Sequence, residues 1–135
     1  MNFDQARDSE QAFKHEEIRR YSVAFVQAGL ALLDRGVGYV GSDDVQCAVD
    51  GTGIAGSAVA TLRNAHVIKD HWGSHPGATP PVVHGRRRSK HASANGRKIC
   101  TYEITSRAMA ETFLDRNGAK VVRGQLELLE LLERR

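Results

Sequence analysis

A run of positive charge in the second half of the chain is the part of the sequence best suited to chemistry. No acidic residue occurs between Asp70 and Glu103. The same interval contains a cluster of cations: Arg86, Arg87, Arg88, Lys90, Arg97 and Lys98. Cations without a neighbouring carboxylate repel one another and are stabilised by phosphates, whose counterions are released on binding. The interval therefore predicts a phosphate-binding segment, and the alternative is a solvated run of charge.

Catalysis and metal binding find little support in the remaining residues. There is no phosphate-binding glycine loop with lysine, no nucleophile elbow and no compact set of carboxylates for metal ions. The acids Asp43, Asp44 and Asp50 are explained by capping and turn roles. We therefore expect a protein that is not an enzyme and that has no cofactor.

The cysteines and histidines also give no support for a metal site. Cys47 and Cys100 are the only cysteines, which is too few for a disulfide framework or a paired zinc motif, and we expect buried thiols in a reducing compartment. The histidine spacing matches no ligand pair fixed by a helix, so we expect scattered surface side chains and no metal site. This expectation covers His66, His71, His75, His84 and His91.

Composition and length indicate one compact domain. The 135 residues suit a single core, and 41% hydrophobic with 26% charged residues exclude wholesale disorder. The N-terminal residues lack the apolar run of a signal peptide, and no stretch approaches the roughly 20 apolar residues that span a bilayer. We expect a cytoplasmic protein without membrane contact, divided into a flexible N-terminus (1–11), one domain (12–118) and a C-terminal helix (119–135).

Helical periodicity predicts the elements that precede the basic run. Apolar residues recur at helical spacing from Ala12 onward, and Gly36 is a suitable terminator. Ser42 is a candidate N-cap for a short helix, Asp43–Val49, which the sequence DGTG ends. A further helix follows over residues 53–65.

Strand and turn signals surround the basic run itself. β-branched and apolar residues predict a strand over 66–72, a proline- and glycine-rich loop over 73–81 and a resumed strand at 82–83. A return strand over 99–105 completes a β-hairpin with a long basic tip. Ser106 is expected to cap a helix that ends near Arg116.

Leucines at helical spacing predict a last helix over 121–135. They could form the seam of a homodimer, or the helix could fold back on its own domain, and we favour the homodimer.

This order resembles that of the winged helix-turn-helix DNA-binding superfamily. The resemblance rests on SDDVQCAV, the turn DGTG, the segment GIAGSAVATLRNAHVI and the strand TYEIT, and it spans about residues 15–105. It implies a mainly α fold with a small β-hairpin (α+β), carrying extra N- and C-terminal helices. It also implies that the helix after the turn lies in the DNA major groove, while the hairpin, or wing, contacts the backbone or the minor groove.

The residues allow a physical interpretation beside that resemblance. In helix 53–65 the apolar side chains, Ile54, Ala58, Val59 and Leu62, should face the core. The outward polar side chains could read base edges: Ser57, Thr61, Arg63 and Asn64. The alternative is that these are ordinary solvent-facing residues.

We therefore expect a double-stranded DNA-binding protein, such as a transcriptional regulator or a replication accessory factor. Two alternatives stay open. One is a protein interaction module that binds through the C-terminal helix, and the other is an RNA-binding protein that uses the same cations.

Overall fold

The computed structural model describes residues 3–47, 53–91 and 96–119, with side chains from residue 10 onward. The protein has a mixed α+β fold, as the sequence predicts. Its helices are α1 (Phe3–Asp34), the 3-10 turn η1 (Ser42–Asp44), α2 (Ile54–Asn64) and α3 (Arg107–Arg116). Its strands are β1 (Ile68–Asp70), β2 (Arg86–Arg88), β3 (Lys98–Cys100) and β4 (Tyr102–Ile104). The predicted helix over 121–135, and with it the proposed dimer seam, lies outside the described residues.

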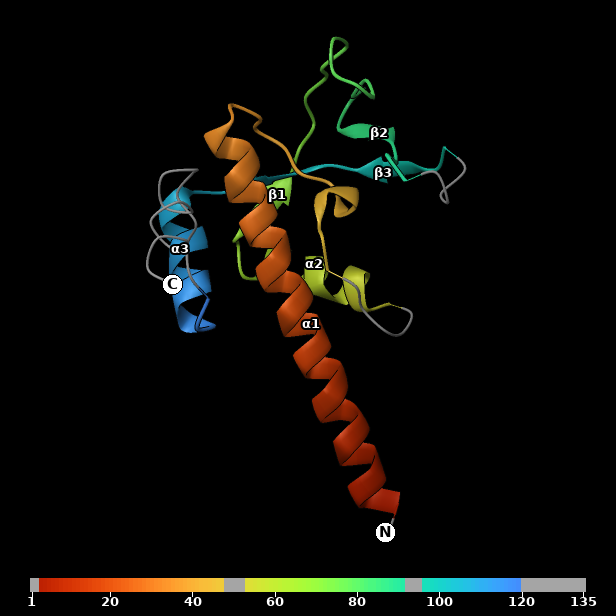
Figure 1. Ribbon diagram of the computed structural model, residues 1–135, viewed down its shortest axis with the longest axis vertical. Helices are drawn as coiled ribbons and strands as arrows, with labels where there is room; N and C mark the ends of the chain where they lie inside the picture. The colour runs from red at the N-terminus through yellow and green to blue at the C-terminus, as the bar shows by residue number, and fades with distance from the viewer. Residues whose placement is uncertain (1–2, 48–52, 92–95, 120–135) are drawn as a thin grey trace, which may run out of the picture.

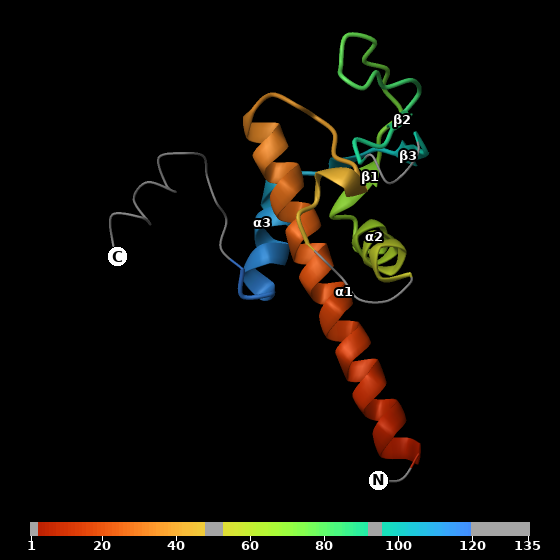
Figure 2. The same ribbon diagram turned by 45° about the vertical axis from the view of Figure 1, so that its right-hand side comes forward.

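Helix α1 is the central element of the fold. It begins at Phe3, earlier than the expected start near Ala12, and its N-terminal part projects beyond the other helices (Figures 1 and 2). Its C-terminal half is buried through residues such as Phe25 and Leu30 and packs against α2 and α3. The predicted terminator is confirmed, because Gly36 has a φ of 84° and the amide of Val37 donates to the carbonyl of Leu32.

The short helix predicted over Asp43–Val49 is wrong for its described part. Residues 42–44 form a single 3-10 turn, and Val45 is already extended, with φ −88° and ψ 120°. The residue before the turn is Gly41, so Ser42 is not the N-cap. The physical reason is that Asp43 and Asp44 pair with cations of the hairpin, and Asp44 caps only the single 3-10 turn by accepting from the amide of Gly41.

The next two helices follow the sequence closely. Helix α2 matches the helix expected over 53–65 and buries Ile54, Ala58 and Leu62 against α1. Helix α3 begins as predicted, because the hydroxyl of Ser106 accepts a hydrogen bond of 3.2 Å from the amide of Met109. It ends before Gly118, whose φ is 68°.

The four strands form two antiparallel pairs that follow one another outward from the core. β1 pairs with β4, and β2 pairs with β3. Val40 adds a bridge on the other side of β4 through two hydrogen bonds of 2.8 Å with Tyr102. The return strand expected over 99–105 is confirmed as β3 and β4. Residues 82–83 form only isolated bridges, and the strand that pairs with β3 consists of the arginines themselves.

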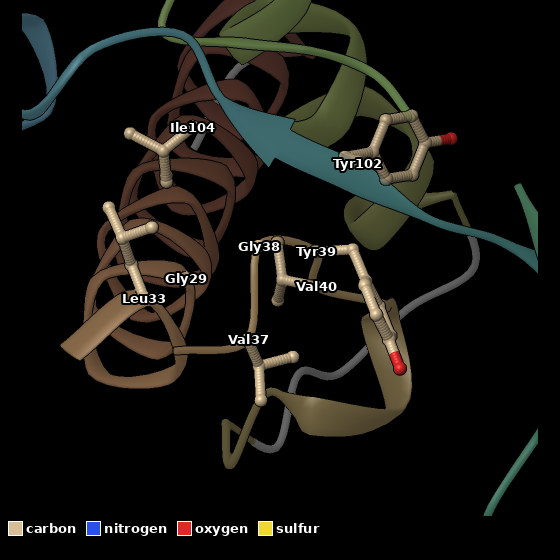
Figure 3. Close-up of a pocket in the computed structure, with 8 residues that line it drawn as sticks. All are labelled: Gly29, Leu33, Val37, Gly38, Tyr39, Val40, Tyr102 and Ile104. Carbon is tan, nitrogen blue, oxygen red and sulfur yellow. The ribbon is translucent and has the colours of Figure 1, made fainter. Parts of the chain in front are cut away.

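A small cavity marks the junction of α1 with this sheet. Its volume is about 30 Å³. Figure 3 shows Leu33 of α1, Val37 of the following segment and Ile104 of β4 around it. Gly29 allows this close packing, because a Cβ there would lie 2.9 Å from Cδ1 of Ile104. The cavity holds at most a water molecule, so it is a packing feature rather than a ligand site.

Candidate nucleic-acid interface

The consecutive arginines of β2 point in alternating directions. Arg86 and Arg88 are exposed, whereas Arg87 is only 4% exposed. This follows from the two-residue period of a strand. The register places Arg88 opposite Lys98 and Arg87 opposite Ile99. We call the exposed side, with Arg86, Arg88 and Lys98, the outer face, and the side with Arg87 and Ile99 the inner face.

The inner face carries a buried ion-pair network. A guanidinium nitrogen of Arg87 lies 2.5 Å from a carboxylate oxygen of Asp43 and 2.8 Å from one of Asp44. These three side chains are 3%, 2% and 9% exposed. Lys90 joins the network, because its Nζ lies 2.8 Å from Asp44 and its amide donates to Asp43. The expectation that no acid lies near the cations is therefore wrong for Arg87 and Lys90, since folding brings the acids in from η1.

Gly41 makes this close approach possible. A Cβ there would lie 2.8 Å from a guanidinium nitrogen of Arg87 and 2.9 Å from Cδ1 of Ile99, so a larger residue would force these side chains out of their present positions. The Gly41 amide also donates to Asp44 over 2.9 Å. Burial alone would raise the pKa of Asp44, but hydrogen bonds from Lys90, Gly41 and Arg87 outweigh it and lower the pKa.

The outer face and the hairpin tip keep their positive charge. Within the part of the chain that the structure describes, no carboxylate lies within ion-pair distance of four of the predicted cations: Arg86, Arg88, Arg97 and Lys98. All four are exposed. Exposed, unpaired guanidinium and ammonium groups on one hairpin can neutralise a series of phosphates.

The polar residues predicted on α2 divide into two sets. Ser57, Thr61 and Asn64 share one side of the helix, and the hydroxyl of Thr61 donates to the carbonyl of Ser57 over 2.8 Å. Arg63 lies on the side that faces the hairpin and forms a 3.0 Å ion pair with Asp70. Ser57 is half-buried and the other three are exposed. Arg63 is thus the predicted α2 residue that adjoins the cations of the hairpin.

A groove of about 360 Å³ separates α2 from β3 and β4. Val59 and Arg63 line it from the helix, and Cys100 and Tyr102 line it from the strands. Both views place α2 and the hairpin on the same side of α1 (Figures 1 and 2).

The expectation of two buried thiols is wrong. Cys47 is half-buried. Cys100 is exposed, because side chains alternate along β3 as they do along β2.

Two of the histidines form a fixed cluster, so the expectation of scattered surface histidines is wrong for them. Nε2 of His71 lies 2.9 Å from Nε2 of His75, and Nδ1 of His71 lies 2.8 Å from Glu103. The ring of Tyr39 stacks on both imidazoles, with centroid distances of 5.2 Å and 4.7 Å. Burial alone would raise the pKa of Glu103, but hydrogen bonds from His71 and Lys69 outweigh it and lower the pKa.

This cluster fastens the loop after β1 to β4 and stiffens the base of the hairpin. The sequence gives no signal for it, because its members come from three separated segments. Across residues 3–47, 53–91 and 96–119, no group of three or more histidine, cysteine, aspartate or glutamate side chains is placed to hold a metal ion.

The hairpin and α2 thus make a positively charged, grooved surface on a rigid base. No helix in the described ranges combines the length and the apolar character needed to cross a membrane. Comparisons of the chain with models of protein families, with curated proteins and with solved structures found no match.

Proposed function

We propose that this chain is a winged-helix protein that binds double-stranded DNA, with α2 as the recognition helix and the β2–β3 hairpin as the wing. The order of elements supports the assignment: helix α1, a bridge at Val40, a turn, α2, and then strands around a basic hairpin. The observation that carries the proposal is the outer face, whose cations stand unpaired within the described residues and one of which, Arg86, lines the same pocket as Arg63 of α2.

Each part of this surface suits a different part of a DNA duplex. The major groove admits an α-helix, and the exposed Arg63 and Asn64 near the end of α2 can donate to base edges. Arg86, Arg88 and Lys98 can neutralise the phosphates beside that groove. Arg87 is excluded from DNA contact in this proposal, because its charge is satisfied by Asp43 and Asp44.

The proposal assigns no catalytic step to the chain. A role in transcription regulation or in DNA replication is compatible with duplex binding. Homodimerisation through residues 121–135 stays a prediction, and so does a cytoplasmic location. Duplex RNA is the main competing ligand, but its deep and narrow major groove would not admit α2, so we favour DNA.

A salt titration of binding tests the proposal. We expect the full chain to bind random duplex DNA, measured by fluorescence anisotropy, with a log–log salt slope of about −3.6 if four hairpin cations each neutralise one phosphate. Duplex RNA of equal length should compete more weakly. Absence of binding at low salt, or binding that salt does not weaken, would contradict the proposal. Stronger competition by duplex RNA would mean that RNA, and not DNA, is the ligand of this surface.

A further inference from the structure

Trp72 is the chain's only tryptophan, and its side chain lies open to solvent. It is 71% exposed, more than any other large hydrophobic side chain among the described residues. It lies two residues after the end of β1, where the chain leaves the core for the hairpin. A single exposed apolar residue is ordinary, so exposure alone assigns no role to Trp72. Its surroundings make the difference.

Trp72 borders a second pocket, of about 120 Å³, that continues the groove beside α2. The two hollows share Arg63, Cys100 and Tyr102. Arg86 of the outer face and the loop residue His84 also line this pocket. The exposed tryptophan, a cation of the outer face and a cation of α2 therefore meet at one place.

The backbone beneath Trp72 is held firmly. The amide of Gly85 donates to the carbonyl of Gly73 over 2.9 Å, and the amide of His84 donates to the hydroxyl of Ser74 over 2.8 Å. His84 has a φ of 48°, a strained conformation for a residue with a side chain. Gly85 is required, because a Cβ there would lie 1.8 Å from the carbonyl oxygen of His71. The pocket is thus built by a specific turn.

The chemistry of the lining suits a nucleobase attached to its phosphate. An indole ring offers a flat surface for stacking, which binds bases of any sequence. Arg86 supplies an unpaired cation for the phosphate, while Asp70 is balanced by its ion pair with Arg63 and can accept from a base edge. A hollow receives a base, whereas a side chain that wedges into a duplex stands on a protrusion.

We propose that the Trp72 pocket binds one unpaired nucleobase of a DNA strand whose phosphates lie on the outer face. This inference rests on the proposed DNA binding. It makes the preferred ligand a duplex with a single-stranded extension, rather than a fully paired duplex. Arg86 connects the two parts of the site, because it belongs both to the outer face and to the pocket.

Intrinsic fluorescence tests the proposal directly, since all tryptophan emission of the full chain comes from Trp72. We expect a duplex with a short thymine overhang to quench this emission and to bind more tightly than the blunt duplex. Trp72→Ala should reduce the preference for the overhang, measured with labelled DNA, by about fivefold to a hundredfold. Trp72→Phe should keep part of the preference, because it keeps an aromatic ring.

Val83→Ala is the matched control, because Val83 is 59% exposed in the same loop but does not line the pocket. It should leave the overhang preference unchanged, and unaltered melting temperatures should establish that all variants fold. If the blunt duplex binds with a steep salt dependence but the overhang adds neither affinity nor quenching, the pocket proposal fails and the proposed function stands. If neither DNA binds, both proposals fail.

Discussion

The two faces of the β2–β3 hairpin use the same kind of residue for opposite purposes. On the inner face, Arg87 is buried between Asp43 and Asp44 and fixes the hairpin to η1. On the outer face, Arg86 and Arg88 are exposed and have no carboxylate partner among the described residues. The direction of each side chain follows from strand alternation alone. A run of like charges therefore need not be a uniform binding surface, since one of its members can be a structural anchor.

Removing the inner arginine is expected to have the largest effect on the protein. Arg87→Ala leaves two carboxylates, Asp43 and Asp44, buried without their main cation, and breaking a buried pair from one side costs about 3–5 kcal/mol. We expect the free energy of unfolding in urea to fall by that amount. Arg88→Ala, one residue further along the strand, should change it by less than about 0.5 kcal/mol. Equal losses of unfolding free energy in the two variants would mean that the inner arginine is no more important to stability than the outer one.

A triple variant separates the pairing from the packing at the same place. Replacing Arg87 by Met and both Asp43 and Asp44 by Asn removes every charge of the buried set while keeping similar volume. Because uncharged replacements of buried ion pairs are often neutral or stabilising, we expect this variant to recover most of the stability lost in Arg87→Ala. A triple variant as unstable as the single one would mean that the guanidinium acts by its shape.

Removing the outer arginines should affect binding but not stability. The double variant Arg86→Ala/Arg88→Ala should weaken duplex DNA binding uniformly across sequences and make the salt slope shallower by about 1.8, or about 0.9 per lost phosphate contact. Its urea unfolding curve should match that of the wild type. Unchanged affinity in this variant would contradict a binding role for the outer face, because its arginines would then be solvated charge only.

Much of the fold could be predicted from the sequence because its elements are defined locally. The periodicity of 53–65, the Ser106 cap and the Gly36 terminator each act within a few residues, and the structure bears them out. The helix expected over Asp43–Val49 failed for a nonlocal reason. Two acids at a candidate helix start look like capping residues, and only the folded chain brings the hairpin cations to them.

The candidate site was predictable in composition but not in detail. The basic interval locates the hairpin, and alternation along 86–88 could have separated Arg87 from its neighbours once those residues were assigned to a strand. Sequence spacing gives no hint that Trp72 and Arg63 line one pocket, or that Tyr39 stacks on two histidines. These contacts join distant segments, so they depend on the path of the loop over 71–85.

Acidification should have the smallest effect of the series on stability, because of the two hairpin faces it changes the charge of only the inner one. The pKa of Asp44 is lowered in the folded protein from its ordinary value of 3.8. A carboxylate with a lowered pKa stabilises the fold fully above its unfolded-state value, and this stabilisation is lost as the pH falls through the folded-state value. We therefore expect the contribution of Asp44 to the unfolding free energy to be complete and independent of pH near neutrality, and to decline below about pH 4.

The decline should be smaller than the loss in Arg87→Ala, because protonating Asp44 removes one charge of the buried set, whereas removing Arg87 leaves two buried carboxylates without their main cation. Glu103, whose pKa is also lowered, adds to the decline, so Asp44→Asn is the variant that isolates the inner face. Its stability should fall less steeply with acid than that of the wild type, in urea titrations repeated across the acidic range. The outer cations keep their charge throughout this range, since arginine and lysine do not titrate there. An Asp44→Asn profile parallel to that of the wild type would mean that the carboxylate contributes nothing through its charge.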